Sequence, residues 1–141
     1  MGILFDHEKL EVYRIAMEYA DAADDIASGL KRGNAHVRDQ LRRASDSIVN
    51  NIAEGAGEFQ PAEKARFYRI ALRSSTECAA TLHTCQRRNL GDLDAIEAAR
   101  VLLKRVVEML TRLIRSTARR QASDRDRDRD RSPDRGAEDS P

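Results

Sequence analysis

Apolar residues recur at alternating steps of three and four over most of the chain, which is the spacing of one buried face of an α-helix. The pattern predicts a first helix from about residue 6 to residue 29, with Asp6 placed to cap it and Gly29 or Gly33 placed to end it. Its expected inner face consists of Val12, Ala16, Tyr19, Ala23, Ile26 and Leu30, widened by Ile15 and Ala22. A second helix is expected from about Asn34, which is placed to cap it, to Glu54. Its inner face consists of Val37, Leu41, Ala44, Ile48 and Ile52.

The segment from Gly55 to Gln60 interrupts the pattern, and Pro61 then stands where the first residue of a helix favours proline. A third helix is expected to run to about residue 89. Its expected inner face consists of Phe67, Ile70, Ala71, Ser74, Cys78, Leu82 and Cys85. Asp92 can cap a fourth helix. Its stripe consists of Ala99, Leu103, Val106, Leu110, Leu113 and Thr117, reinforced by Leu102, Met109 and Ile114. Four helices with short connections predict an all-α, antiparallel up-down four-helix bundle.

The composition agrees with a single helical domain. The chain has 141 residues, of which 40% are hydrophobic, 35% charged and 4% aromatic. No apolar run approaches the roughly 18 residues of a membrane span, and the first residues lack the basic and apolar regions of a secretory signal. We therefore expect a cytoplasmic protein with no membrane association. Two cysteines, Cys78 and Cys85, are too few for a disulfide framework.

The composition changes at residue 121. Asp and Arg alternate from residue 124 to residue 131, and only Ala122 and Ala137 are hydrophobic in residues 121–141. Such a stretch cannot offset its ordering entropy, which predicts a bundle over residues 1–120 and a disordered tail over residues 121–141. The tail is either merely solvated or a contact segment for RNA or a partner.

The motifs of common enzyme and metal sites are absent from the sequence. It contains no Glu-x-x-His pair of a di-iron bundle, no Walker loop and no Gly-x-Ser-x-Gly elbow. Cys78 and Cys85 share a helix face that His83 does not, so we interpret them as core residues and expect neither a metal nor a cofactor. The pair Gly55 and Gly57 is interpreted as a helix terminator rather than a phosphate cradle. We therefore expect a protein that is not an enzyme.

The charge is segregated although the net charge is only +1. The first helix is acidic, whereas the second and third are basic. Basic stripes attract phosphate backbones, and they also pair with acidic helices of the same or a neighbouring subunit. The candidate nucleic-acid contacts are Arg38, Arg42, Lys64, Arg66, Arg69 and Arg73.

The end of the second helix carries an unusual polar group. Asn lowers helix propensity, yet Asn51 and Glu54 lie near this end. In the structural interpretation they satisfy backbone groups there, and Arg43 pairs with Glu54 or with Glu77 of the third helix. An enzyme of unknown type would instead need Glu54 and Glu77 in an unexpected pocket.

These residues carry a family resemblance. Arg43-Ala44, Ser47-Ile48 and the run from Asn51 to Gly55 resemble the signature of the bacterial four-helix-bundle proteins encoded in intervening sequences of 23S ribosomal RNA genes. The resemblance covers about residues 8–117 and includes similar positions of the third helix: Phe67, Tyr68, Ala71, Ser74, Ser75 and Glu77. Arg73, where the family often has Gly, and the Asp/Arg tail are departures.

The resemblance implies an up-down bundle that assembles as a cyclic homo-oligomer, with a pentamer suspected. A related group, the accessory variability determinants of diversity-generating retroelements, uses a basic pentameric barrel to bind nucleic acid and reverse transcriptase. The resemblance supplies no catalytic residues. Its motif residues in this chain, interpreted as structural, are Arg43, Asn51, Glu54, Gly55 and Glu77.

Two functions from different classes follow. The first is a non-enzymatic, oligomeric bundle that binds structured RNA or DNA through the basic face of helices two and three. The alternative is a protein–protein scaffold or an accessory subunit, for example of a reverse transcriptase, whose basic face pairs with neighbouring subunits.

Overall fold

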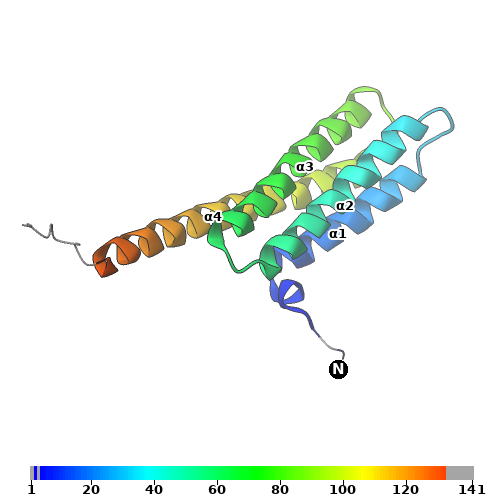
Figure 1. Cartoon of the computed structure of the whole chain (residues 1–141). Coiled ribbons are helices and arrows are strands. Elements are labelled where there is room, and N and C mark those ends of the chain that lie inside the picture. The colour runs from blue at the N-terminus through cyan, green and yellow to red at the C-terminus, as the bar shows by residue number, and fades with distance from the viewer. Residues whose placement is uncertain (1, 3, 133–141) are drawn as a thin grey trace, which may run out of the picture.

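The computed structural model describes residue 2 and residues 4–132, and this part of the chain is all-α, with no strand (Figure 1). A short 3-10 helix, η1 (Asp6–Lys9), precedes the four α-helices. These are α1 (Glu11–Ser28), α2 (Ala35–Gly57), α3 (Pro61–Arg87) and α4 (Leu93–Arg131). The predicted class and the predicted number of helices are confirmed.

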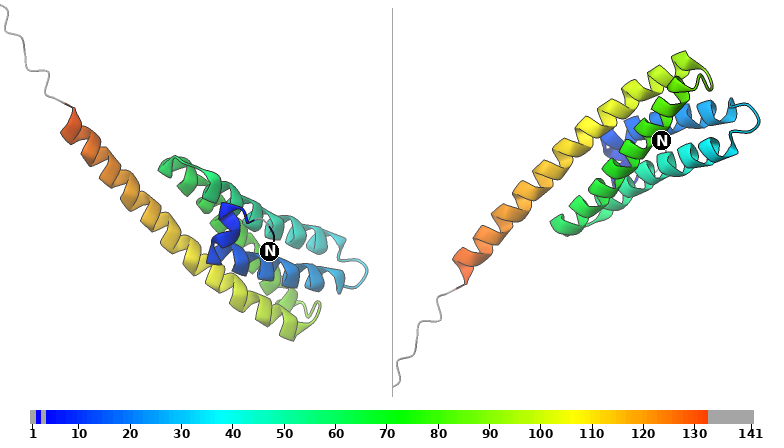
Figure 2. Two further views of the ribbon diagram at one scale, coloured as in Figure 1. Left: turned by 90° about the horizontal axis from the view of Figure 1, so that it is seen from below. Right: turned by 90° about the horizontal axis from the view of Figure 1, so that it is seen from above.

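The four helices surround one core. α1 packs against α2 and α4, and α3 packs against the same two helices, whereas η1 lies against α1 and α2. The inner face of every helix therefore meets two neighbours, which is why each apolar stripe is wider than a coiled-coil seam. α4 is the longest helix and runs well past the end of the bundle (Figure 2).

The helix ends follow local chemistry, with three corrections to the sequence-based expectations. Asp92 caps α4 as expected, because its carboxylate accepts the backbone N–H groups of Asp94 at 3.0 Å and Ala95 at 3.2 Å. Asp6 does not cap α1, which begins only at Glu11 because residues 6–9 form the separate turn η1. Asn34 does not cap α2 with its side chain, which donates from Nδ2 to the carbonyl of Lys31 at 3.1 Å instead. α2 ends at Gly57 rather than at Glu54.

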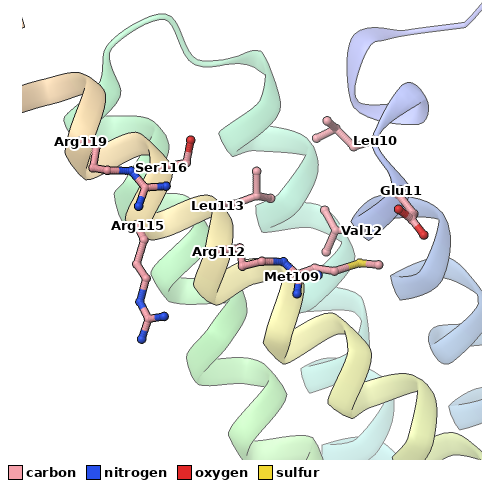
Figure 3. A pocket seen from close by; sticks show the side chains of 9 residues that line it. All are labelled: Leu10, Glu11, Val12, Met109, Arg112, Leu113, Arg115, Ser116 and Arg119. Atoms are coloured by element: carbon pink, nitrogen blue, oxygen red, sulfur yellow. The ribbon is translucent and has the colours of Figure 1, made fainter. Parts of the chain in front are cut away.

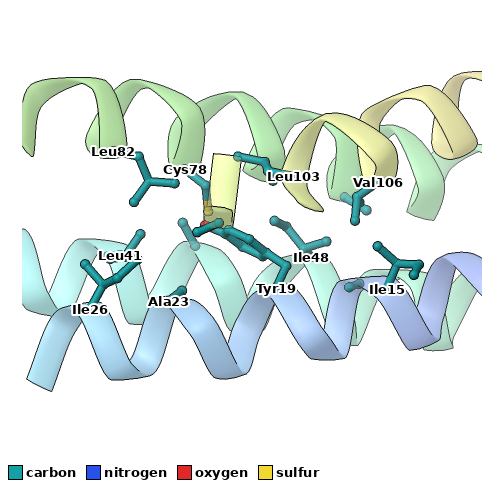
Figure 4. Packing of buried hydrophobic residues seen from close by; sticks show 14 of the residues in the cluster. Ile15, Tyr19, Ala23, Ile26, Leu41, Ile48, Cys78, Leu82, Leu103 and Val106 are labelled. Carbon is teal, nitrogen blue, oxygen red and sulfur yellow. The ribbon is translucent and has the colours of Figure 1, made fainter. Parts of the chain in front are cut away.

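The predicted inner faces of α1, α2 and α4 form the core (Figure 4). Six residues of these predicted faces are half-buried rather than buried: Ala22, Val37, Leu102, Met109, Leu113 and Ile114. In the first half of α3 the expectation was wrong. Phe67 and Ile70 are half-buried, and Ala65 and Tyr68 occupy the inner positions.

The end of the chain differs from the sequence expectation. α4 continues to Arg131, so residues 121–131 are helical rather than a disordered tail that starts at residue 121. Extending an existing helix carries no nucleation cost, and Asp and Arg three positions apart attract, as in the 3.9 Å pair of Arg127 and Asp124. The rest of the predicted tail, residues 133–141, lies outside the described residues.

Candidate nucleic-acid interface

The motif residues lie where α2 meets α3, and two polar pairs join the helices there. Nη2 of Arg43 donates to Oε1 of Glu77 at 2.6 Å, and the hydroxyls of Ser47 and Ser74 are 2.8 Å apart. The Arg43–Glu77 pair is one of the two expected from the sequence. Both side chains are partly exposed, so this pair contributes about 1 kcal/mol at most.

At Gly55 the backbone of α2 lies directly against a side chain of α3. A Cβ built on Gly55 would lie 2.7 Å from Cε1 and 2.8 Å from Cδ1 of Tyr68, a ring that is itself buried. Any side chain at position 55 would therefore have to displace this ring. The motif glycine is a packing requirement, and nothing in this geometry resembles a cradle for phosphate.

The two remaining motif residues differ in role. Asn51 donates from Nδ2 to the carbonyl of Ser47 at 2.8 Å and to its hydroxyl at 3.2 Å, which fits the structural interpretation. Glu54 is exposed and makes no hydrogen bond or ion pair with the described residues, so the expected backbone contact is wrong. Since Glu77 is ion-paired and Glu54 exposed, the buried carboxylate pair of the enzyme hypothesis does not occur in this part of the chain.

Two of the six candidate contacts are engaged within the bundle. Arg38 donates from Nε to the carbonyl of Ala27 at 3.1 Å and from Nη2 to that of Leu30 at 3.0 Å, so it satisfies backbone groups where α1 ends. Arg42 donates from Nε to the carboxylate of Asp24 at 2.9 Å. Both side chains join α1 to α2.

Lys64 has a similar role at the other end of the bundle. Its ammonium donates to the carbonyls of Gly55 at 2.7 Å and Ala56 at 3.2 Å, and thereby satisfies the last carbonyls of α2. This contact explains why α2 continues past Glu54. Desolvation, and then the positive charge of Arg120 nearby, lowers the pKa of Lys64.

The other three candidates form an exposed row on α3. Arg66 is held by Glu63, with Nη2 and Oε2 3.1 Å apart, and lies 4.6 Å from the centre of the Phe67 ring. Arg69 and Arg73 are exposed and have no hydrogen bond or ion pair among residues 2 and 4–132. The α3 row, defined as Arg66, Arg69 and Arg73, therefore offers at least two guanidinium groups to a ligand.

Sequence reasoning missed a second basic segment, on α4. Between residues 100 and 120 this helix carries seven Arg and Lys residues and one acid, Glu108. The number of basic residues between positions 100 and 120 is the sequence feature that indicates this segment. Arg112, Arg115 and Arg119 border a groove of about 490 Å³ between the start of α1 and α4 (Figure 3).

The cysteines belong to the core. Cys78 and Cys85 are buried, and burial raises the pKa of both thiols. Ser45 lies between two buried partners, since its hydroxyl donates to the Tyr19 hydroxyl at 3.3 Å and is 3.6 Å from Sγ of Cys78. His83 is exposed, and no group of three or more potential metal ligands occurs in the described ranges.

Within residues 2 and 4–132, no helix has both the length and the apolar character needed to cross a membrane.

Comparisons with known proteins identify the family of this chain. A search of curated proteins found no match. The family model for the 23S rRNA-intervening sequence protein matches residues 8–112, which include the second half of η1, all of α1 to α3, the first half of α4 and every motif residue named above. The match covers well over half of the chain, and the chain therefore belongs to the 23S rRNA-intervening sequence protein family.

Proposed function

We propose that this protein binds structured RNA or DNA through an exposed basic face and catalyses no reaction. The observation that carries the proposal is the pair Arg69 and Arg73, which are exposed on one side of α3 without a partner among the described residues. Exposed, unpaired guanidinium groups attract phosphate backbones, and the family's association with ribosomal RNA genes agrees with that ligand.

The proposed face is narrower than the sequence expectation. Arg38 and Lys64 donate to backbone carbonyls at helix ends, and Arg42 donates to both Asp24 and Ser28, so we leave these three out of the proposed face. The α3 row is the part of the original set that remains, with Arg66 able to exchange the exposed Glu63 for a phosphate.

The test is fluorescence anisotropy with an RNA hairpin and a duplex DNA across a salt series. The variant Arg69→Ala/Arg73→Ala is compared with Lys9→Ala/Arg14→Ala, which removes the same charge from exposed positions on the acidic side of the molecule. We expect the α3 variant to bind more weakly and to lower the salt slope by roughly two, about 0.9 for each lost phosphate contact. Unchanged affinity and slope, or an equal loss in the control, would refute the proposal.

We further propose that the helices run antiparallel, up and down, and that the chain forms a cyclic homo-oligomer, with five subunits the first candidate. The contacts between α2 and α3 support the antiparallel arrangement, because Arg43, Ser47 and Gly55 meet Glu77, Ser74 and Tyr68 in reverse order. The mass in solution from light scattering tests the assembly. A monomeric mass at micromolar concentration would contradict it. The cytoplasmic location stays a prediction.

A second candidate function is a protein–protein scaffold or accessory subunit, with a reverse transcriptase as one example of a partner. The groove between α1 and α4 favours it, since apolar side chains of Leu10, Met109 and Leu113 lie beside the guanidinium groups that border it (Figure 3). Met109→Glu would then change the mass of the assembly or abolish partner binding without changing the affinity for nucleic acid. An unchanged mass and partner affinity would remove this candidate.

A further inference from the structure

The connection between α2 and α3 exposes an aromatic ring that neither the core nor the motif explains. Phe59 is 96% exposed, more than any other large apolar residue in the described part of the chain. A single exposed apolar residue needs no explanation by itself. A ligand for this ring can therefore be argued only from the residues around Phe59.

A polar hollow adjoins this connection. It has a volume of about 450 Å³ and lies between residues 60–62 and the part of α4 from Gln121 to Arg131, which runs past the start of α3 (Figure 1). The hollow is lined by two aspartates and by three arginines of the segment that the sequence predicts to be a disordered tail: Arg125, Arg127 and Arg131. The helical extension of α4 thus brings guanidinium groups next to the segment that carries the exposed ring.

More positive charge gathers at the same end. Lys64 lies close enough to Arg120 of α4 for that charge to lower its pKa, and Arg66 follows two residues later on α3. From this end the α3 row continues along the helix. Phe59 therefore lies in the connection that leads directly into the helix carrying the α3 row.

We infer that this end of the bundle binds an unpaired nucleotide of the nucleic acid, with Phe59 stacking on its base and the arginines of the α4 extension contacting its phosphates. The inference rests on the proposed function. Phe59 directly precedes Gln60, which lines the hollow together with the arginines. Exposed aromatic rings and nearby arginines are the combination by which proteins bind single strands, because every base offers a flat face to the ring and the backbone needs cations. Bases within a duplex are already stacked and cannot accept the ring.

The surroundings of Phe59 favour a nucleotide over a protein partner. A protein interface is centred on a buried apolar anchor within an apolar patch. The hollow beside Phe59 is lined by Arg, Asp and Gln side chains instead, together with Pro61 and Ala62. Docking of a protein at Phe59 would appear in the test below as a change in the mass of the assembly without a change in RNA affinity.

The test uses the full chain and two RNA hairpins that share one stem, one blunt and one with a single-stranded tail. Phe59→Ala should weaken binding of the tailed hairpin about fivefold or more, the effect of losing one base–aromatic stack, and leave the blunt hairpin within about twofold. Phe59→Leu should behave like Phe59→Ala, and Phe59→Trp should retain full binding. Val101→Ala, which truncates another exposed apolar side chain, is the control.

The chain contains no tryptophan, so Phe59→Trp also provides a single fluorescent reporter. Its emission should be quenched by the tailed hairpin and not by the blunt one. The inference is overturned if Phe59→Ala binds both hairpins with wild-type affinity, if it loses the same affinity for both, or if the indole emission of Phe59→Trp is not quenched at saturating tailed hairpin. A change in the mass of the assembly without a change in RNA affinity also overturns it, in favour of a protein contact.

The same data separate the two proposals. If the wild-type protein binds the blunt hairpin through the α3 row but Phe59→Ala binds both hairpins normally, only the nucleotide site fails. If the wild-type protein binds neither hairpin at low salt, both proposals fail together.

Discussion

At the scale of single residues, Gly55 is the glycine at which an added side chain would come closest to its neighbours. The ring of Tyr68 occupies the space of its missing side chain, although Gly55 lies within α2, where alanine would be the better helix former. Close packing therefore outweighs helix propensity at this position.

Replacing Gly55 by alanine should destabilise the protein. The Cβ would displace a buried ring, which costs about 1–3 kcal/mol in the free energy of unfolding and exceeds the gain in helix propensity of about 1 kcal/mol. Gly57→Ala is the matched control, since it lies in the same helix with nothing within 4 Å of its added Cβ. Urea unfolding followed by circular dichroism should show a lower midpoint for Gly55→Ala only, and equal midpoints would contradict the packing argument.

The buried cluster of Tyr19, Ser45 and Cys78 links the core to pH. Burial above all, and then the neighbouring Cys78, raises the pKa of Tyr19 far above its ordinary value of 10.0. Burial likewise raises the pKa of Cys78 above 9.0. The unfolded chain releases these protons at a lower pH than the folded protein does.

Stability should therefore be lost in alkali. Because both folded pKa values are raised, the stabilising effect is complete below pH 9 and declines as the pH rises through 9 and 10. We expect the urea midpoint to fall above pH 9, and we expect this fall to be smaller in Tyr19→Phe. A midpoint that is constant from pH 8 to pH 11 in the wild type (roughly two units beyond the thiol's ordinary value) would be incompatible with this cluster.

At the scale of elements, α4 is the helix that departs most from its expected form. Its apolar contacts end near Thr117, and the residues after Gln121 are all exposed, yet the helix continues to Arg131. The extension thus depends on propagation from the packed part of α4 and on its own charge pairs, each of which contributes only about 0.2–0.5 kcal/mol. It should be the least stable helical segment of the described chain.

The extension should consequently melt before the bundle. In a thermal scan of the far-ultraviolet circular dichroism, the full chain should lose ellipticity gradually before the main transition, and a chain that ends at Arg120 should lack this phase. The main transition should occur at the same temperature in both, because the extension covers almost no core. A lower transition temperature in the shortened chain would mean that the extension stabilises the bundle.

The first half of α3 illustrates the limit of sequence prediction for an element. Phe67 and Tyr68 are adjacent aromatics, and the apolar period alone favoured the more hydrophobic one for the core. The structure selects Tyr68 because the gap at Gly55 accepts its ring, while Phe67 remains half-buried beneath the guanidinium of Arg66. Which of the two aromatic rings is buried therefore depends on the neighbouring helix α2, and the apolar period of α3 does not predict it.

At the scale of the whole molecule, the basic residues divide into two groups. Arg38, Arg42 and Lys64 hold helix ends together, whereas Arg69 and Arg73 face outward without a partner among the described residues. Residues of one chemical type thus serve folding in the first group, and in the second group they are available to a ligand.

Stability measurements should separate the two groups. Arg38→Met removes two hydrogen bonds to the end of α1 and should lower the free energy of unfolding by about 1–2 kcal/mol. Arg73→Met removes an exposed side chain and should change it by less than about 0.5 kcal/mol. If Arg73→Met were the more destabilising change in urea unfolding, the outward row would have a structural role after all.

The sequence by itself determined the helices and most of the core, because helical period, prolines and capping residues act over a few positions of one chain. It also identified the motif and with it the family, since the Asn51–Gly55 run is local. Tertiary structure alone decided which arginines have partners within the bundle and which aromatic of α3 is buried, and it brought the α4 extension next to residues 60–62, which directly follow Phe59. Each of these depends on what a neighbouring helix presents, and no spacing within one helix carries that information.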